Sequence, residues 1–190
     1  MTTNIFAATA PTYWAANLPV IPLYTNSKIP AVPEWSRYCT EFPDASTQQS
    51  WLAVHASGNI GLPLGSLSGV VVLDIDIDSY LSTLIQTCLF DHITWIRCGS
   101  KGKALAFKYA GEKPFRLYGE KGSLICELLS QGQQIVLAPS IHPTTQQPYL
   151  ENYPLYEVEL KNLPEGVDEI INDLIIKYEE TYGSIYPSKP

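Results

Sequence analysis

The stretch GVVVLDIDIDSY, residues 69–80, decides the predicted fold. Its apolar start, residues 70–73, is typical of a strand in the middle of a sheet. Alternate side chains of a strand share a face, so Asp74 and Asp76 project the same way, about 7 Å apart at about 3.3 Å per residue. The other face is apolar and carries Val71, Leu73, Ile75 and Ile77. The sequence therefore predicts a central strand with one apolar and one acidic face.

The acidic face has two interpretations. Two bare carboxylates on a buried strand repel each other and lose hydration, and a divalent cation would offset both costs. Mg²⁺ and Mn²⁺ prefer such oxygen ligands. The alternative is that this face is simply exposed to solvent. The next acid, Asp78, is expected to cap the following helix, with Ser79 as the other candidate cap.

Glu127, in SLICELL (123–129), is the candidate third acid. It completes a metal-binding set only if its strand lies beside that of Asp74. Otherwise it faces water.

Composition and charge limit the possible classes of protein. The chain has 190 residues, of which 45% are hydrophobic and 16% charged, enough for one large domain or two closely joined halves. No apolar run approaches the roughly 20 residues of a membrane span, and the N-terminus lacks a signal-peptide pattern. We therefore expect a cytoplasmic protein with no membrane contact. The net charge of −7 excludes a broadly basic nucleic-acid surface, so any such surface must be local.

The cysteines predict neither zinc binding nor a disulfide framework. They are Cys39, Cys88, Cys98 and Cys126. No two form a CxxC pair, and none lies near a histidine at ligand spacing. We interpret all four as buried thiols in a reducing compartment.

The first sixty residues alternate between short elements and proline-rich loops. A short strand is expected within 17–24, a rigid loop at 27–35, and a helix within 40–56 that begins near Asp44 to Ser46. The expected buried residues of this helix are Trp51, Leu52 and Val54.

The remaining elements predict an α+β fold. Strands are expected at 59–65, 69–76, 93–99, 103–110, 123–129 and 133–140, and helices at 78–90 and 164–183. The apolar face of the first of these helices comprises Leu81, Leu84, Ile85, Cys88 and Leu89. The last two strands are predicted to form a hairpin around SQGQ. Several consecutive strands after an alternating start favour α+β over a doubly wound sheet.

Two loops carry further candidate residues. The turn between the strands at 93–99 and 103–110 holds Ser100, Lys101 and Lys103 among glycines, and its backbone N–H groups can cradle a phosphate. A plain surface hairpin turn is the alternative, because the spacing of a Walker loop is absent. In APSIHP (138–143), a rigid loop would hold Ser140 and His142 near the sheet edge; a structural histidine is the alternative there.

In chain order, several of these segments resemble a known family. NLPVIPLY, SKIPAVPEW, NIGLPLG, GVVVLDIDID, the Gly–Lys turn, CELLSQGQQIVLAPSIHP and PY (148–149) together resemble the N-terminal prim-pol domain of bifunctional DNA primase/polymerases. That domain belongs to the archaeo-eukaryotic primase superfamily. The resemblance covers about residues 11–155.

The resemblance implies an architecture for the whole chain. A single prim-pol domain, 1–190, would contain an N-terminal α/β half at 1–65, an RRM-like catalytic half at 66–160 and a C-terminal helix at 164–183. The active cleft would lie between the two halves.

The resemblance also implies roles for individual residues. The metal-binding and catalytic acids would be Asp74, Asp76 and Glu127, and Ser140 and His142 would lie near the nucleotide. The second motif of the family usually ends in a histidine that meets the nucleotide phosphates, and Ala104 or Leu105 stands there in this chain. We expect the Gly–Lys turn, with Ser100, Lys101 and Lys103, to bind the nucleotide instead. The predicted DNA contacts are Lys28 and Arg97.

The predicted function is that of a DNA primase/polymerase domain with Mg²⁺ or Mn²⁺ as cofactor. It would transfer an NTP or dNTP under the direction of a single-stranded DNA template, in replication of plasmids, phages or prophages. A replicative helicase, as a further domain or a separate subunit, is the implied partner, and the chain would then be a fragment of a larger protein. One alternative is an inactive prim-pol relative that docks nucleotides or DNA, favoured by the missing histidine and the acidic charge. A metal-dependent phosphodiesterase or nuclease is the other.

Overall fold

The computed structural model describes residues 4–186 and shows an α+β protein. The four α-helices are α1 Ile5–Ala15, α2 Ala45–Val54, α3 Tyr80–Cys88 and α4 Val167–Tyr182. The strands are β1 Ile21–Leu23, β2 Asn59–Pro63, β3 Val70–Ile75, β4 Trp95–Cys98, β5 Lys103–Lys108, β6 Phe115–Tyr118, β7 Leu124–Leu129, β8 Gln134–Val136 and β9 Leu150–Glu151. Short 3₁₀ helices span Trp35–Cys39, Phe90–His92 and Leu155–Glu157.

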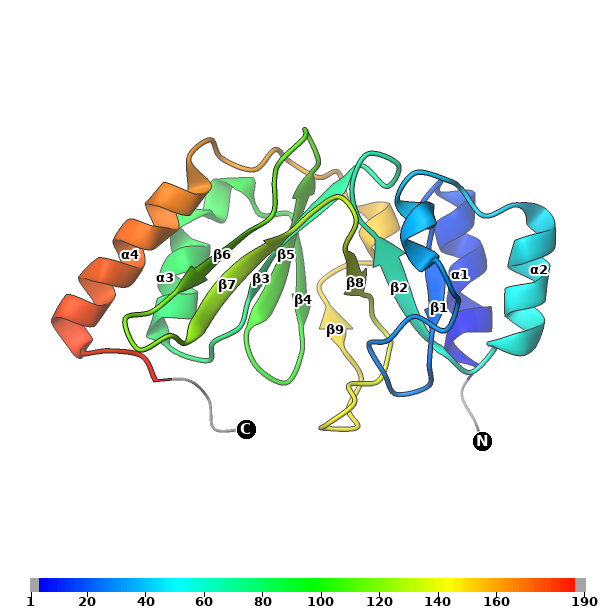
Figure 1. The fold of residues 1–190 in the computed structure, drawn as a ribbon, viewed down its shortest axis with the longest axis horizontal. Helices are drawn as coiled ribbons and strands as arrows, with labels where there is room; N and C mark the ends of the chain where they lie inside the picture. Colours follow the sequence, from blue (N-terminus) through cyan, green and yellow to red (C-terminus); the bar gives the residue numbers. More distant parts are fainter. Residues whose placement is uncertain (1–3, 187–190) are drawn as a thin grey trace.

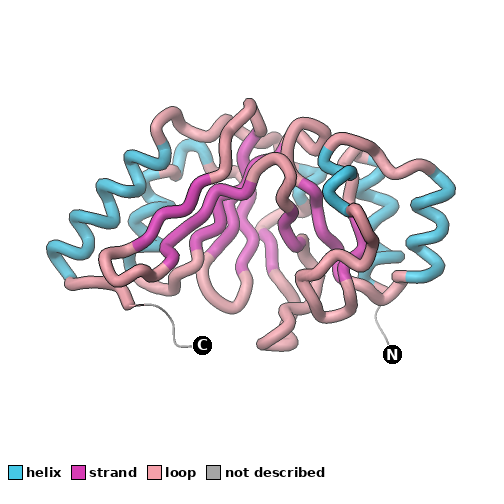
Figure 2. Tube along the Cα trace, in the orientation of Figure 1, coloured by secondary structure: helices cyan, strands magenta, loops and turns pink. Residues whose placement is uncertain are grey.

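The strands form two antiparallel sheets. The larger has the order β6-β7-β3-β5-β4-β9 and the smaller the order β1-β2-β8. Both sheets lie in the middle of the molecule, with α3 and α4 beyond the larger sheet and α1 and α2 beyond the smaller one (Figure 1). Helices therefore occupy the two ends and strands the centre (Figure 2).

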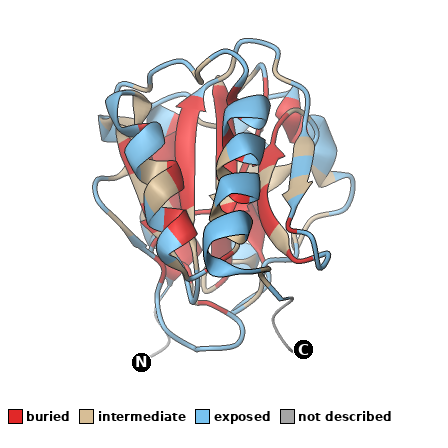
Figure 3. Ribbon diagram, turned by 90° about the vertical axis from the view of Figure 1, so that its left-hand side faces the viewer, coloured by how far each residue is buried: buried red, intermediate tan, exposed pale blue. Residues whose placement is uncertain are grey.

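The central position of β3 is confirmed, because β3 pairs with both β5 and β7. Its side chains alternate between two hydrophobic clusters. Val71, Leu73 and Ile75 pack with residues of α3 and α4. Val70 and Val72 pack instead with the cluster formed by the smaller sheet, α1 and α2. The larger sheet is thus buried behind α3 and α4, whose outer faces are exposed (Figure 3).

The helix predictions are largely confirmed, with three corrections at their ends and faces. Asp44 caps α2, and its carboxylate accepts the Thr47 N–H at 2.7 Å. Of the three residues predicted to be buried, Trp51 is buried, Leu52 packs half-buried against the same core, and Val54 is 70% exposed. The N-cap of α3 is Ser79 and not Asp78.

Cys88 does not belong to the buried face of α3. The buried stripe follows an i, i+4 spacing through Leu81, Ile85 and Leu89, and Cys88 falls outside it. The expectation of four buried thiols is therefore wrong for Cys88, which is exposed, and for Cys98, which is half-buried.

The predicted hairpin at residues 123–140 is wrong. β7 pairs with β3 and β6, whereas β8 pairs with β2 in the other sheet. The turn between them carries the chain from one sheet to the other. Three of the named helices and strands, α1, β6 and β9, have no counterpart among the predicted ones. Pro11 lies inside α1, and proline is unfavourable in a helix interior, so the sequence did not indicate this helix. Among the described helices, none has the length and apolar character needed to cross a bilayer.

Candidate functional site

A line of charged side chains crosses one face of the larger sheet. Residues directly opposite each other in an antiparallel sheet share a face. The register aligns one residue from each strand of this sheet. In the order β6, β7, β3, β5, β4 and β9, these are Arg116, Glu127, Asp74, Ala104, Arg97 and Glu151. We call this line the charged row. In this row Asp74 and Glu127 are direct cross-strand partners. The strand of Glu127 therefore lies beside that of Asp74, as a metal-binding set of three acids requires.

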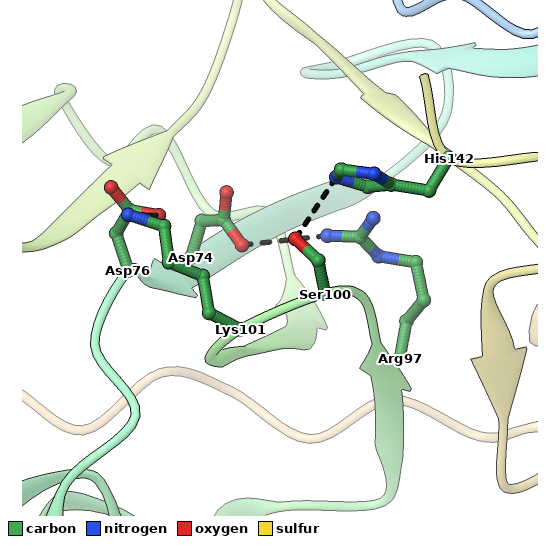
Figure 4. Close-up of polar contacts among 6 residues, drawn as sticks. All are labelled: Asp74, Asp76, Arg97, Ser100, Lys101 and His142. Carbon is green, nitrogen blue, oxygen red and sulfur yellow. Dashed lines mark hydrogen bonds and ion pairs between the residues drawn. The ribbon is translucent and has the colours of Figure 1, made fainter. Parts of the chain in front are cut away.

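A pocket of about 480 Å³ lies on the Asp74 side of the charged row. We call it the site pocket. Its walls come from the ends of β3 and β4, the β4–β5 turn, the loop before β9 and the loop after β1. Figure 4 shows the side chains of Asp74, Asp76, Arg97, Ser100, Lys101 and His142 at this site. The lining residues are Lys28, Asp74, Asp76, Arg97, Gly99, Ser100, Lys101, His142, Pro143, Thr144 and Tyr149. Segments far apart in sequence therefore bring acids and bases to one cavity.

Asp74 is a half-buried carboxylate held by the buried Arg97 side chain. The Arg97 Nη2 atom lies 3.4 Å from Asp74 Oδ1, and the Arg97 side chain is only 7% exposed. Burial raises the pKa of Asp74; Arg97 and Lys28 oppose this effect. The carboxylates of Asp76 and Glu127 raise that pKa further. A cation in this pocket would relieve the same repulsion.

Arg97 reaches Asp74 over a small residue. The two side chains arise on strands separated by β5, roughly 10 Å apart, and Ala104 stands between them in the charged row. The Arg97 guanidinium rests on the ring of Tyr149, 4.6 Å from its centroid. Its Nε atom is buried and has no hydrogen-bond partner within the described chain. One donor of Arg97 is therefore left unpaired by the described residues.

The β4–β5 turn folds onto the end of β3. Gly102 has φ +62°, and a Cβ there would overlap the carbonyl oxygen of Ile75, so the turn requires glycine. This approach places Lys101 Nζ 3.2 Å from Asp76 Oδ1. Both partners remain about 40% exposed, at 41% and 39%.

His142 joins the turn to the loop before β9. Its Nδ1 accepts the backbone N–H groups of Thr144 and Thr145, both at 3.2 Å. In the neutral imidazole the proton is then on Nε2, which donates to Ser100 Oγ at 3.1 Å. Burial lowers the pKa of His142, and Lys28 and Arg97 lower it further. His142 is thus a neutral hydrogen-bond donor at the pocket wall.

Three residues proposed from the sequence lie outside the site pocket. Lys103 projects from the opposite face of β5, where its Nζ donates to Gln86 Oε1 at 3.0 Å. The buried hydroxyl of Ser140 accepts the Ile60 N–H at 2.9 Å. Glu127 accepts a hydrogen bond from Arg116 Nε at 2.8 Å, toward the sheet edge.

Tyr149 and Arg116 are site residues with no role assigned from the sequence. The Pro148–Tyr149 pair is part of the family resemblance, but only the fold shows Tyr149 beneath Arg97. Arg116 lies on the four-residue strand β6, which is not among the predicted strands.

The acids fit a divalent metal by chemistry but are paired with bases in this arrangement. Across residues 4–186, no three Asp, Glu, His or Cys side chains are grouped closely enough to hold a metal ion. Asp74, Asp76 and Glu127 each contact an arginine or a lysine instead. Their carboxylate oxygens nevertheless suit Mg²⁺ or Mn²⁺, and two of the three line the site pocket.

Carboxylates suit a divalent metal and basic side chains suit phosphate groups, and both kinds line the site pocket of this α+β fold. A family model described as bifunctional DNA primase/polymerase, N-terminal, matches residues 10–166. This match covers most of the chain, which therefore belongs to the Prim-Pol family of DNA primase/polymerases. No curated protein matches the sequence.

Proposed function

We propose that this chain is a primase/polymerase domain that performs nucleotidyl transfer on a single-stranded DNA template. The observation that carries the proposal is the site pocket, where Asp74 and Asp76 meet three basic residues. These basic residues are Lys28, Arg97 and Lys101. The acids suit a metal, and the bases suit the triphosphate of an NTP or dNTP and the phosphates of the template.

We infer that the two sheets act as the two halves of the domain, with the site pocket as the active cleft. The larger sheet, as an RRM-like catalytic half, supplies all three acids. The smaller sheet, as the N-terminal half, supplies Lys28 from the loop after β1. It also includes β8, so one strand of this half comes from beyond residue 65.

Arg97 takes the place of the histidine missing from the second motif. A histidine at 104 would stand between Asp74 and Arg97 in the charged row. The alanine there leaves room for the guanidinium, which is always charged and can bind phosphate through two donors at once. Ser100, Lys101 and His142 supply further donors around the triphosphate.

Asp74, Asp76 and Glu127 would hold two Mg²⁺ or Mn²⁺ ions, which when bound would activate the attacking hydroxyl and carry charge on the leaving pyrophosphate. Arg97 and Lys101, relieved of their carboxylate partners, would then turn to the phosphates. The net charge of −7 weakens template binding by the chain alone. This supports reliance on a partner such as a replicative helicase in the replication of a plasmid, phage or prophage.

The test is a nucleotide-extension assay on primed and unprimed templates with Mg²⁺ or Mn²⁺. We expect metal-dependent products from the wild type and about a thousandfold loss in Asp74→Asn, because a misplaced metal forfeits several kcal/mol of transition-state stabilisation. Asp78→Asn, which changes an exposed acid outside the pocket, is the matched control and should retain activity. Equal activity in Asp74→Asn and the wild type would reject the proposal.

An inactive relative that docks nucleotides or DNA is the second candidate. Two observations favour it: the second-motif histidine is absent, and each of the three acids is paired with a basic side chain. Nucleotide binding without any product, with either metal and in folded protein, would select this function over catalysis.

A further inference from the structure

A second pocket, of about 370 Å³, lies over the other end of the charged row. We call it the edge pocket. It is lined by Pro114, Phe115, Arg116, Glu127, Leu128 and Gln133. Glu127 belongs to this pocket and not to the site pocket, although Asp74 is its direct cross-strand partner.

The position of the Glu127 carboxylate is set by Arg116. Arg116 Nε donates to Glu127 Oε2 at 2.8 Å across the β6–β7 pair. Because β7 lies between β6 and β3, Glu127 has a neighbour in the charged row on either side, each about 5 Å away. One neighbour is Arg116 and the other is Asp74. The carboxylate now faces the basic neighbour at the edge of the sheet.

Arg116 is placed to bind a nucleic-acid strand. Its side chain is 59% exposed, on the same sheet face as the site pocket. Tyr118, 50% exposed, lies close enough to interact with the same guanidinium. Arginine binds phosphate oxygens through paired donors, and tyrosine can stack on a base. Exposed ion pairs are weak, so a phosphate can displace the Glu127 carboxylate from Arg116.

We propose that Arg116 is a clamp that holds Glu127 away from Asp74 until a phosphodiester of the template or primer strand binds Arg116. Glu127 then turns to complete the acid set beside Asp74. This rests on the proposed function, because it takes the three acids to be metal ligands. By linkage, nucleic acid and divalent metal must then each strengthen the binding of the other.

The test is the affinity of the full chain for Mn²⁺, measured by calorimetry with and without a short single-stranded oligonucleotide. A titration of the oligonucleotide alone is subtracted. In the wild type we expect the oligonucleotide to raise Mn²⁺ affinity about fivefold. Arg116→Gln should have the raised Mn²⁺ affinity even without oligonucleotide, and adding the oligonucleotide should not increase that affinity further. Lys113→Gln, which removes an exposed cation near β6, is the matched control and should behave as the wild type.

Two outcomes overturn the clamp: equal Mn²⁺ affinity for Arg116→Gln and the wild type, or a wild type indifferent to oligonucleotide. A parallel arm with Asp74→Asn separates this failure from failure of the proposed function. Mn²⁺ binding that needs Asp74 but ignores Arg116 rejects only the clamp. Mn²⁺ binding that is absent, or unaffected by Asp74→Asn, rejects the metal role of the acids as well.

Discussion

The two faces of β3 differ in what covers them and in their roles. On the helix side, Leu73 and its neighbours at alternate positions are buried under α3 and α4 along the full strand. On the other side, Val70 and Val72 are buried against the smaller sheet, but Asp74 opens into the site pocket. The candidate site therefore lies where the smaller sheet leaves the end of β3 uncovered. The face of β3 that packs against α3 and α4 holds the strand in position.

The largest expected effect on stability is on the helix side. Leu73 is fully buried, so Leu73→Ala should lower the free energy of unfolding by about 3 kcal/mol through lost burial and a residual cavity. Urea unfolding followed by circular dichroism measures this change. Val54→Ala, at an exposed apolar position, should change stability by less than about 0.5 kcal/mol. Similar losses in both variants would contradict the view that this face carries the core.

A smaller, pH-dependent effect is expected on the pocket side, at His142. Its pKa is lowered in the folded chain by burial, Lys28 and Arg97, so the unfolded chain binds the proton first as pH falls below about 6.5. The stability contributed by neutral His142 is complete above that pH and is lost on acidification. Melting temperatures between pH 7 and pH 5 should therefore fall more steeply for the wild type than for His142→Gln. Parallel curves would show that the imidazole is not held neutral.

The smallest effect distinguishes Lys101, in the β4–β5 turn, from Lys103, the first residue of β5. Lys101 lines the site pocket, whereas Lys103 projects to the helix side and donates to Gln86. Titration with a fluorescent nucleoside triphosphate should give about threefold weaker binding for Lys101→Gln, as expected for one exposed charge. Lys103→Gln should bind as the wild type does. Equal weakening in the two variants would mean that the triphosphate does not occupy the site pocket.

Elements with strong local signals were predictable. The apolar run of β3, the cap of α2 at Asp44 and the amphipathic pattern of α4 each reside in a few consecutive residues. The hairpin failed because adjacency in sequence is a poor guide to pairing when a chain changes sheets. β7 and β8 follow each other closely, yet their partners are β3 and β2. Such pairing depends on contacts between distant segments, which a local pattern does not contain.

The candidate site divides in the same way. Asp74 and Asp76 could be selected from the sequence, because strand alternation places both on one face. The relation of Glu127 to them depends on register, since a slip of one residue would move its side chain to the helix side. The pairing of each acid with its own basic residue depends on the turn at Gly102 and on the edge strand β6.

By itself, the sequence determined the α+β class, the central strand and the family, because these rest on local pattern and on motifs in chain order. The tertiary structure alone decided which charges meet. In the folded chain, Arg97 reaches across Ala104 and contacts Asp74. Lys103 points away from the site pocket and donates to Gln86, and Glu127 pairs with Arg116. The physical reason is that electrostatic interactions depend on distance and burial, and for residues on different strands both are set only when the sheet forms.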